Sequence, residues 1–142
     1  MSISEHPDTI VVDVANVMGA RPDGWWRDRA GAAVRLHAEV AALAASGRAI
    51  LPGETDPAEF VMVFEGAANA AGSRIRDART DRVRVVHAPG HGDDAIVAVV
   101  RELPGRRVVV TADRELRDRC AAAGTEVRSP GWLLGLLKQM KQ

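Results

Sequence analysis

Acidic residues follow short apolar runs at several places in the chain. Asp13 closes the run "TIVVD", Glu65 follows "EFVMVF", and Asp113 lies two residues after "RRVVVT". An acidic pair, Asp93 and Asp94, stands between a glycine-containing turn and a further apolar run. These positions raise the question of whether the carboxylates come together in the folded protein.

Carboxylates that crowd together repel one another unless a proton or a cation relieves the repulsion. A ligand set made of oxygens, without cysteine and with few histidines, suits Mg²⁺ or Mn²⁺ rather than zinc. Such an ion activates water and stabilises the charge of a phosphodiester transition state. The chemistry predicted is therefore metal-dependent phosphoryl transfer to water.

The elements that would position these acids are short strands separated by helices. Apolar runs predict strands, and spacings of three and four residues predict helices. Strands are expected over 9–14, 59–66, 81–90, 106–111 and 125–128, and helices over 25–46, 93–103, 113–123 and from Pro130 to the C-terminus; residues 67–80 fit a short helix or an open loop equally well. This order predicts an α/β fold, a three-layer α/β/α sandwich with a mostly parallel central sheet.

Sites in such sheets lie beyond the carboxyl ends of the strands. If the first and fourth strands are neighbours, Asp13 and Asp113 converge at one end of the sheet. Each acid at a helix start also has a simpler explanation: Asp93 and Asp94 can serve as cap and as first-turn acid that compensates the helix dipole, and Asp113 can cap the next helix. Asp13 is harder to explain in this way, since a carboxylate at the end of a buried strand needs a partner.

The composition narrows the class of protein. With 142 residues, of which 46% are hydrophobic, the chain is expected to form a single domain over 1–142. The 19 basic and 19 acidic residues cancel, so any nucleic-acid site must come from local patterning. One cysteine, Cys120, excludes a disulfide framework, and no apolar run is long enough to span a membrane. We expect a cytoplasmic protein without a membrane partner.

Two local patterns fit contact with a nucleic acid. Trp25 and Trp26 offer either a platform for stacking bases or core packing at a helix entry, with Arg27 beside them to contact phosphates. The segment "SRIRDARTDRVR", with five arginines from Arg74 to Arg84, fits either a phosphate-tracking surface or a protected sheet edge.

Three blocks of the sequence, "VVDVANVMG" (11–19), "GDDAIVAVV" (92–100) and "VVVTADRELRDRC" (108–120), resemble those of the NYN branch of PIN-like ribonuclease domains. The segment "RPDGWWRDRAGAAVRLHAEV" is similar to NYN proteins common in actinobacteria. The resemblance implies a PIN-like fold and an acidic site that binds Mg²⁺ or Mn²⁺ and cleaves single-stranded or structured RNA.

The resemblance also implies roles for particular residues. Asp13, the pair Asp93 and Asp94, and Asp113 match the acids of the family, with Asp13, Asp94 and Asp113 as core metal ligands and Glu65 and Asp93 as outer ligands or water-positioning bases. Asn16 matches the asparagine that follows the first aspartate and would orient a water or a phosphate. Thr111 or Arg114 would contact the substrate backbone. Apart from the resemblance, Trp26 and Arg27 are candidate substrate-binding residues through stacking and phosphate contact.

The chain departs from the family at three of these positions. Val14 and Ala15 stand where the family usually has a glycine and a polar residue, and Glu65 replaces an aspartate with a side chain one methylene longer. Because catalytic groups must be placed to within about an ångström, the alternative is a catalytically weak or inactive module that binds RNA or a protein. The apolar helix after Pro130 packs on the sheet or forms a homodimer contact, so the chain is expected to be a monomer or a homodimer.

Overall fold

The computed structural model describes residues 6–53, 57–66 and 82–141, and in them five parallel strands form one sheet. The strands are β1 (Thr9–Asp13), β2 (Glu59–Phe64), β3 (Val83–His87), β4 (Arg107–Val110) and β5 (Glu126–Arg128). Their order is β3-β2-β1-β4-β5, so β1 lies in the centre with β2 and β4 on either side. The first and fourth strands expected from the sequence are thus neighbours, which is the condition for Asp13 and Asp113 to converge.

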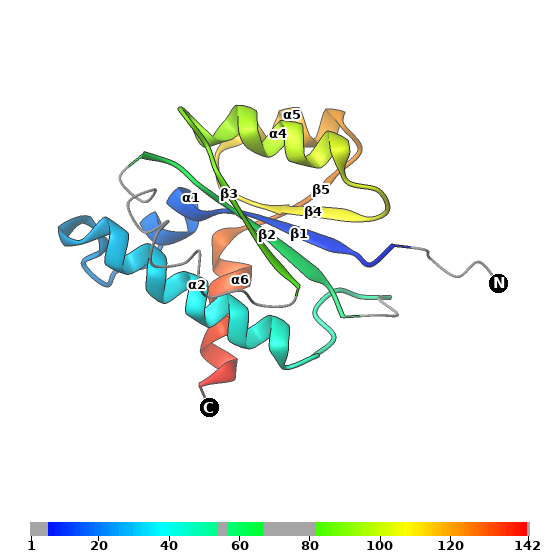
Figure 1. Ribbon diagram of the computed structural model, residues 1–142. Coiled ribbons are helices and arrows are strands. Elements are labelled where there is room, and N and C mark those ends of the chain that lie inside the picture. Colours follow the sequence, from blue (N-terminus) through cyan, green and yellow to red (C-terminus); the bar gives the residue numbers. More distant parts are fainter. Residues whose placement is uncertain (1–5, 54–56, 67–81, 142) are drawn as a thin grey trace.

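Helices cover both faces of the sheet (Figure 1). They are α1 (Val14–Gly19), the 3-10 helix η1 (Trp25–Arg27), α2 (Arg29–Ala45), α4 (Gly92–Glu102), α5 (Arg114–Ala122) and α6 (Pro130–Met140). Residues of α1, α2 and α6 form one hydrophobic core with the sheet, and residues of α4 and α5 form a second core on the opposite face. The three-layer α/β/α sandwich expected from the sequence is therefore confirmed, with a sheet that is parallel throughout.

Successive side chains of a strand point to opposite faces of the sheet, which divides the residues of each strand between the two cores. In β1, Ile10 and Val12 enter the core beneath α2, whereas Val11 enters the core beneath α4 and α5. All five residues of β1 are buried, as a central strand covered on both faces requires.

Two elements differ from the sequence expectation near β1. Residues after Asp13 form helix α1 rather than a loop, because the Asp13 carboxylate caps the new helix by accepting from the backbone N–H of Asn16. The long helix begins at Arg29 rather than at Trp25, because Asp28 caps it and accepts from the Gly31 N–H at 2.9 Å. The tryptophan pair therefore lies on the separate short helix η1.

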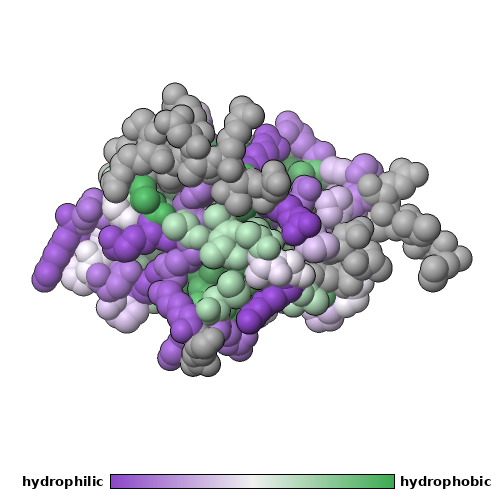
Figure 2. All heavy atoms as spheres, turned by 60° about the horizontal axis from the view of Figure 1, so that its bottom comes forward, coloured by the Kyte–Doolittle hydropathy of each residue, from purple (hydrophilic) through white to green (hydrophobic). Residues whose placement is uncertain are grey.

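The face that carries α2 and α6 shows a central hydrophobic area surrounded by hydrophilic side chains (Figure 2). In α6, Leu133 and Leu137 are buried in the core beneath this face, while Trp132 and Leu136 are partly buried. The C-terminal helix therefore packs on the domain itself, as the first of its two sequence interpretations expects. None of the described helices combines the length and the apolar character needed to cross a membrane.

Candidate active site

The alternation of side chains places three polar residues at the carboxyl ends of neighbouring strands on one face of the sheet. Asp13 follows Val12, Glu65 follows Phe64, and Thr111 follows Val110, and in each pair the apolar residue belongs to the core beneath α2. Because successive side chains alternate, Asp13, Glu65 and Thr111 lie on the opposite face of the sheet, beneath α4 and α5. The first turns of those two helices carry Asp93, Asp94 and the capping residue Asp113.

Thr111 connects two of the acidic residues. Its hydroxyl donates a hydrogen bond to Asp13 Oδ2 at 2.9 Å and accepts one from the Asp113 backbone N–H at 3.1 Å. The residue is 0% exposed, so this hydroxyl does not reach an external substrate backbone, contrary to the sequence expectation. Thr111 instead holds the Asp13 carboxylate in place between β1 and the start of α5.

Asn16 makes a second connection between the first and fourth strands. Its side-chain oxygen accepts from the Ala112 backbone N–H at 2.7 Å, and its own backbone N–H donates to Asp13 Oδ1 at 3.4 Å. This ties α1 to the loop between β4 and α5. The side-chain oxygen thus has a hydrogen-bond partner within the protein. The water or phosphate contact that the resemblance implies stays a prediction.

Asp113 has a structural role as well as its place near the site. It is the N-cap residue of α5, and its Oδ1 accepts from the Leu116 N–H at 2.9 Å. The capping interpretation of this residue is therefore confirmed. Capping engages one carboxylate oxygen, and a carboxylate has lone pairs on both of its oxygens.

Glu65 approaches the start of α4 very closely. Its carboxylate accepts a hydrogen bond from the Gly92 backbone N–H, in the first turn of that helix. A β-carbon at position 92 would lie 3.0 Å from Glu65 Oε2, so glycine leaves the space that this approach needs. A larger residue at position 92 would therefore make the Glu65 carboxylate shift, so glycine before the acidic pair favours this contact.

The adjacent aspartates Asp93 and Asp94 point to different surroundings. The N-cap of α4 is His91, so neither aspartate caps the helix, but both lie in its first turn, as the simpler sequence interpretation also expects. Asp94 has a side chain 86% exposed and forms a salt bridge with Arg119 of α5 at 3.0 Å. Asp93 is half-buried and faces the charges of Asp113 and Glu65. Consecutive helical residues are about 100° apart, which explains the separation.

The electrostatics define an acidic cluster of Asp13, Glu65, Asp93 and Asp113. Burial, above all, raises the pKa of Asp13 from its usual 3.8 to about 6; hydrogen bonds from Thr111 and Asn16 oppose the change, and the charges of Glu65 and Asp93 add to it. Burial also raises the pKa of Asp93, followed by repulsion from Asp113 and Glu65. Asp13 is thus exposed to the charges of Glu65 and Asp93, and Asp93 to those of Asp113 and Glu65, at the carboxyl ends of β1, β2 and β4.

The donor set of the acidic cluster fits a hard divalent cation only in part. All donors are carboxylate oxygens, which Mg²⁺ and Mn²⁺ prefer. Among the described residues, however, no three histidines, cysteines or acids are arranged to ligate a single ion directly. The expected trio of Asp13, Asp94 and Asp113 is therefore not assembled, since Asp94 turns outward to Arg119. The cluster suits an ion held by one or two carboxylates that keeps several of its waters, as Mg²⁺ commonly does.

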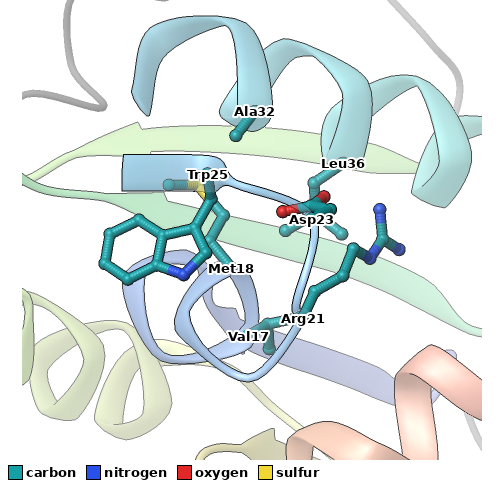
Figure 3. Close-up of a pocket in the computed structure, with 7 residues that line it drawn as sticks. All are labelled: Val17, Met18, Arg21, Asp23, Trp25, Ala32 and Leu36. Atoms are coloured by element: carbon teal, nitrogen blue, oxygen red, sulfur yellow. The ribbon is translucent and has the colours of Figure 1, made fainter. Parts of the chain in front are cut away.

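The tryptophan pair lies beside α1. The two rings meet edge to face with centroids 6.1 Å apart, Trp26 is 57% exposed, and the guanidinium carbon of Arg27 lies 5.9 Å from its ring centroid. Trp25 is partly buried and lines a small pocket with Val17 and Met18 (Figure 3). The pocket volume of about 10 Å³ is too small for a nucleotide. Trp26 and Arg27 are the part of this region that a substrate can reach.

The other basic residues that the sequence offers for contact with RNA are Arg114 and the arginine-rich segment. Arg114, in the first turn of α5, is exposed next to the acidic cluster. Of the arginine-rich segment, Arg74, Arg76 and Arg79 lie outside the described residues. Arg82 and Arg84 are exposed, and the Arg82 guanidinium donates to the Ala44 carbonyl at 3.3 Å.

Comparison with solved structures shows which fold this is. The chain is similar to the crystal structure of Rae1 (YacP) from Bacillus subtilis, determined as its W164L mutant, with a TM-score of 0.70 and 17% sequence identity over 94% of this chain and 77% of the other. No known protein family and no curated protein matches the sequence. The likeness shows a fold shared across most of both chains, and in the described residues of this chain that fold is an all-parallel α/β/α sandwich.

Proposed function

We propose that the protein is a metal-dependent endoribonuclease that hydrolyses RNA phosphodiester bonds at the acidic cluster. The observation that carries the proposal is the buried Asp13 carboxylate, linked through Thr111 to Asp113 and electrostatically coupled to Glu65 and Asp93. Crowding of carboxylates costs folding free energy, and it is typical of sites where a cation or a proton takes part in the function. The fold likeness and the three sequence blocks support the same assignment.

In this proposal Asp13, with Asp93 and Asp113 as its neighbours, holds Mg²⁺ or Mn²⁺, and Glu65 lies at the edge of the site. The bound ion would supply an activated water and would stabilise the charge that develops on the phosphate. Thr111 and Asn16 act as positioning residues, because each fixes the Asp13 carboxylate and the start of α5. Trp26, Arg27 and Arg114 are the exposed residues that would contact RNA.

The direct test is incubation of the purified protein with a panel of labelled single-stranded and hairpin RNAs in the presence of Mg²⁺ or Mn²⁺. We expect internal cleavage that stops when the cation is chelated. RNAs that stay intact with both metals, at every pH from about 6 to 9, would overturn the proposal.

A second function is favoured by the lack of three direct ligands among the described acids. A PIN-like module that binds RNA or a protein without turnover needs no complete metal site. It predicts RNA binding that persists in chelator and no cleavage by the wild-type protein. Cleavage that depends on a divalent cation excludes it.

The two adjacent aspartates of α4 provide an internal comparison. Asp93→Asn is expected to lower kcat for RNA cleavage by about 10²-fold or more, because its carboxylate belongs to the acidic cluster. Asp94→Asn removes the same charge one residue away, at an exposed position paired with Arg119, and is expected to change kcat less than about threefold. Single-turnover cleavage of one RNA by both variants measures the difference. Equal loss in both, or greater loss in Asp94→Asn, contradicts the assignment of Asp93 to the cluster.

Trp26 is expected to contribute to substrate binding by stacking. Trp26→Ala removes an exposed ring and is expected to raise KM for single-stranded RNA about 5- to 150-fold, since stacking on an aromatic ring contributes roughly 1 to 3 kcal/mol per base. Trp26→Phe, which keeps an aromatic face, serves as the control and is expected to restore most of the affinity. A KM that is unchanged in Trp26→Ala removes this residue from the binding surface.

A further inference from the structure

A groove runs along the outer side of α5, between this helix and the edge strand β5. It is lined by Ala112, Arg114, Arg117, Asp118, Ala121, Thr125 and Val127. On α5 the lining residues are spaced at i, i+3, i+4 and i+7, which places them on one stripe of the helix. The groove therefore has a helix face as one wall and the short strand β5 as the other.

Two arginines dominate the charge of this groove. Arg114 and Arg117 are exposed, and neither guanidinium group forms a hydrogen bond or salt bridge with another described residue. By contrast, Arg119 of the same helix faces the other way and is paired with Asp94. Asp118 is the one acidic residue in the lining, so the groove presents two guanidinium groups against one carboxylate.

One end of the groove adjoins the loop that carries Asp113 of the acidic cluster. Ala112, at one end of it, directly precedes Asp113, and its backbone N–H is bonded to Asn16 next to Asp13. From Arg114 to Ala121 the helix rises about 10 Å at 1.5 Å per residue, enough to accompany one to two nucleotides. A strand lying in the groove would thus have one end beside Asp113 of the acidic cluster.

We propose that this groove binds the phosphate backbone of single-stranded RNA on one side of the cleaved bond, with Arg114 and Arg117 contacting successive phosphates. The inference rests on the proposed function, because the position of the groove beside the acidic cluster is what selects RNA as the occupant. Guanidinium forks suit phosphate oxygens, and such contacts position a strand without reading its sequence. Asp118 opposes the binding through its charge and limits the affinity.

Binding of a fluorescently labelled 12-nucleotide RNA, measured in chelator over a range of salt concentrations, tests the proposal separately from cleavage. Arg114→Gln/Arg117→Gln is expected to weaken binding on the order of tenfold at moderate salt. The slope of log K against log salt is expected to become shallower by about 1.4, since each phosphate contact on a single strand contributes about 0.7. Asp118→Asn is expected to bind more tightly than the wild type.

The matched control is Arg35→Gln, an exposed arginine on α2 at the opposite face of the sheet, which is expected to leave both the affinity and the slope unchanged. If Arg114→Gln/Arg117→Gln keeps the wild-type affinity and slope while the wild-type protein cleaves RNA, the groove proposal is overturned and the proposed function stands. If binding depends on the groove but no RNA is cleaved with Mg²⁺ or Mn²⁺, the groove stands and the nuclease proposal fails.

Discussion

Asp13→Asn is expected to lower kcat for RNA cleavage on the order of a thousandfold at saturating RNA and cation. Loss of an anionic group that holds the ion removes several kcal/mol of transition-state stabilisation, and about 4 kcal/mol corresponds to this factor. Asparagine has the same shape, and its side-chain oxygen can still accept from the Asn16 N–H, so the helix cap at the start of α1 is retained. The loss therefore reports on charge rather than on folding.

Glu102→Gln is the control for this experiment. Glu102 is an exposed acid at the other end of α4, and the change removes one negative charge from the same element without touching the acidic cluster. It is expected to cleave RNA at the wild-type rate. The assignment of Asp13 would be falsified if Asp13→Asn retained more than about a tenth of the wild-type kcat while the cation remained required.

The sequence was sufficient for the fold because local signals agree with the topology. Buried runs such as Thr9–Asp13 and Arg107–Val110, each followed by a helix, leave few arrangements other than parallel strands with right-handed crossovers. The convergence of Asp13 and Asp113 followed from one assumption about strand order, and the pairing of β1 with β4 confirms it.

The details of the candidate site depended on geometry that residue types alone do not give. Which of Asp93 and Asp94 faces the other acids depends on where α4 begins, and a helix that begins at Gly92 turns Asp94 toward Arg119. The sequence pattern did not predict helix α1, because its six residues include two β-branched valines and end at a glycine, which is a weak helical pattern.

The sequence carries a signal for the role of Thr111 as a partner of Asp13. Thr111 continues the alternation of β4 by one residue, as Asp13 closes that of β1, so both side chains fall on the face beneath α4 and α5. A threonine in that register is a partner for the buried carboxylate rather than a surface contact. The same alternation applies to Glu65, which explains why it reaches the Gly92 N–H.

The stability of the cation-free protein is expected to depend on pH through Asp13. Burial raises the pKa of its carboxyl from 3.8 to about 6, so the folded state holds this proton more tightly than the unfolded chain does. The resulting stabilisation is fully present below about pH 4, is lost as the pH rises through about 6, and is absent above that range. A shift of this size corresponds to about 3 kcal/mol of unfolding free energy.

Asp13→Asn has no carboxyl proton to lose, so its unfolding free energy is expected not to fall as the pH rises through about 6. Urea unfolding of both proteins in chelator should give unfolding free energies that differ by less than about 1 kcal/mol at pH 4, and by roughly 2 to 3 kcal/mol in favour of the variant at pH 8. Adding Mn²⁺ at pH 8 should stabilise the wild type more than the variant, because an ion that binds only the folded state adds to its stability. A difference between the two proteins that stays constant with pH would show that the Asp13 carboxyl ionises as freely in the folded protein as in the unfolded one. The repulsion that motivates a cation at the acidic cluster would then be absent.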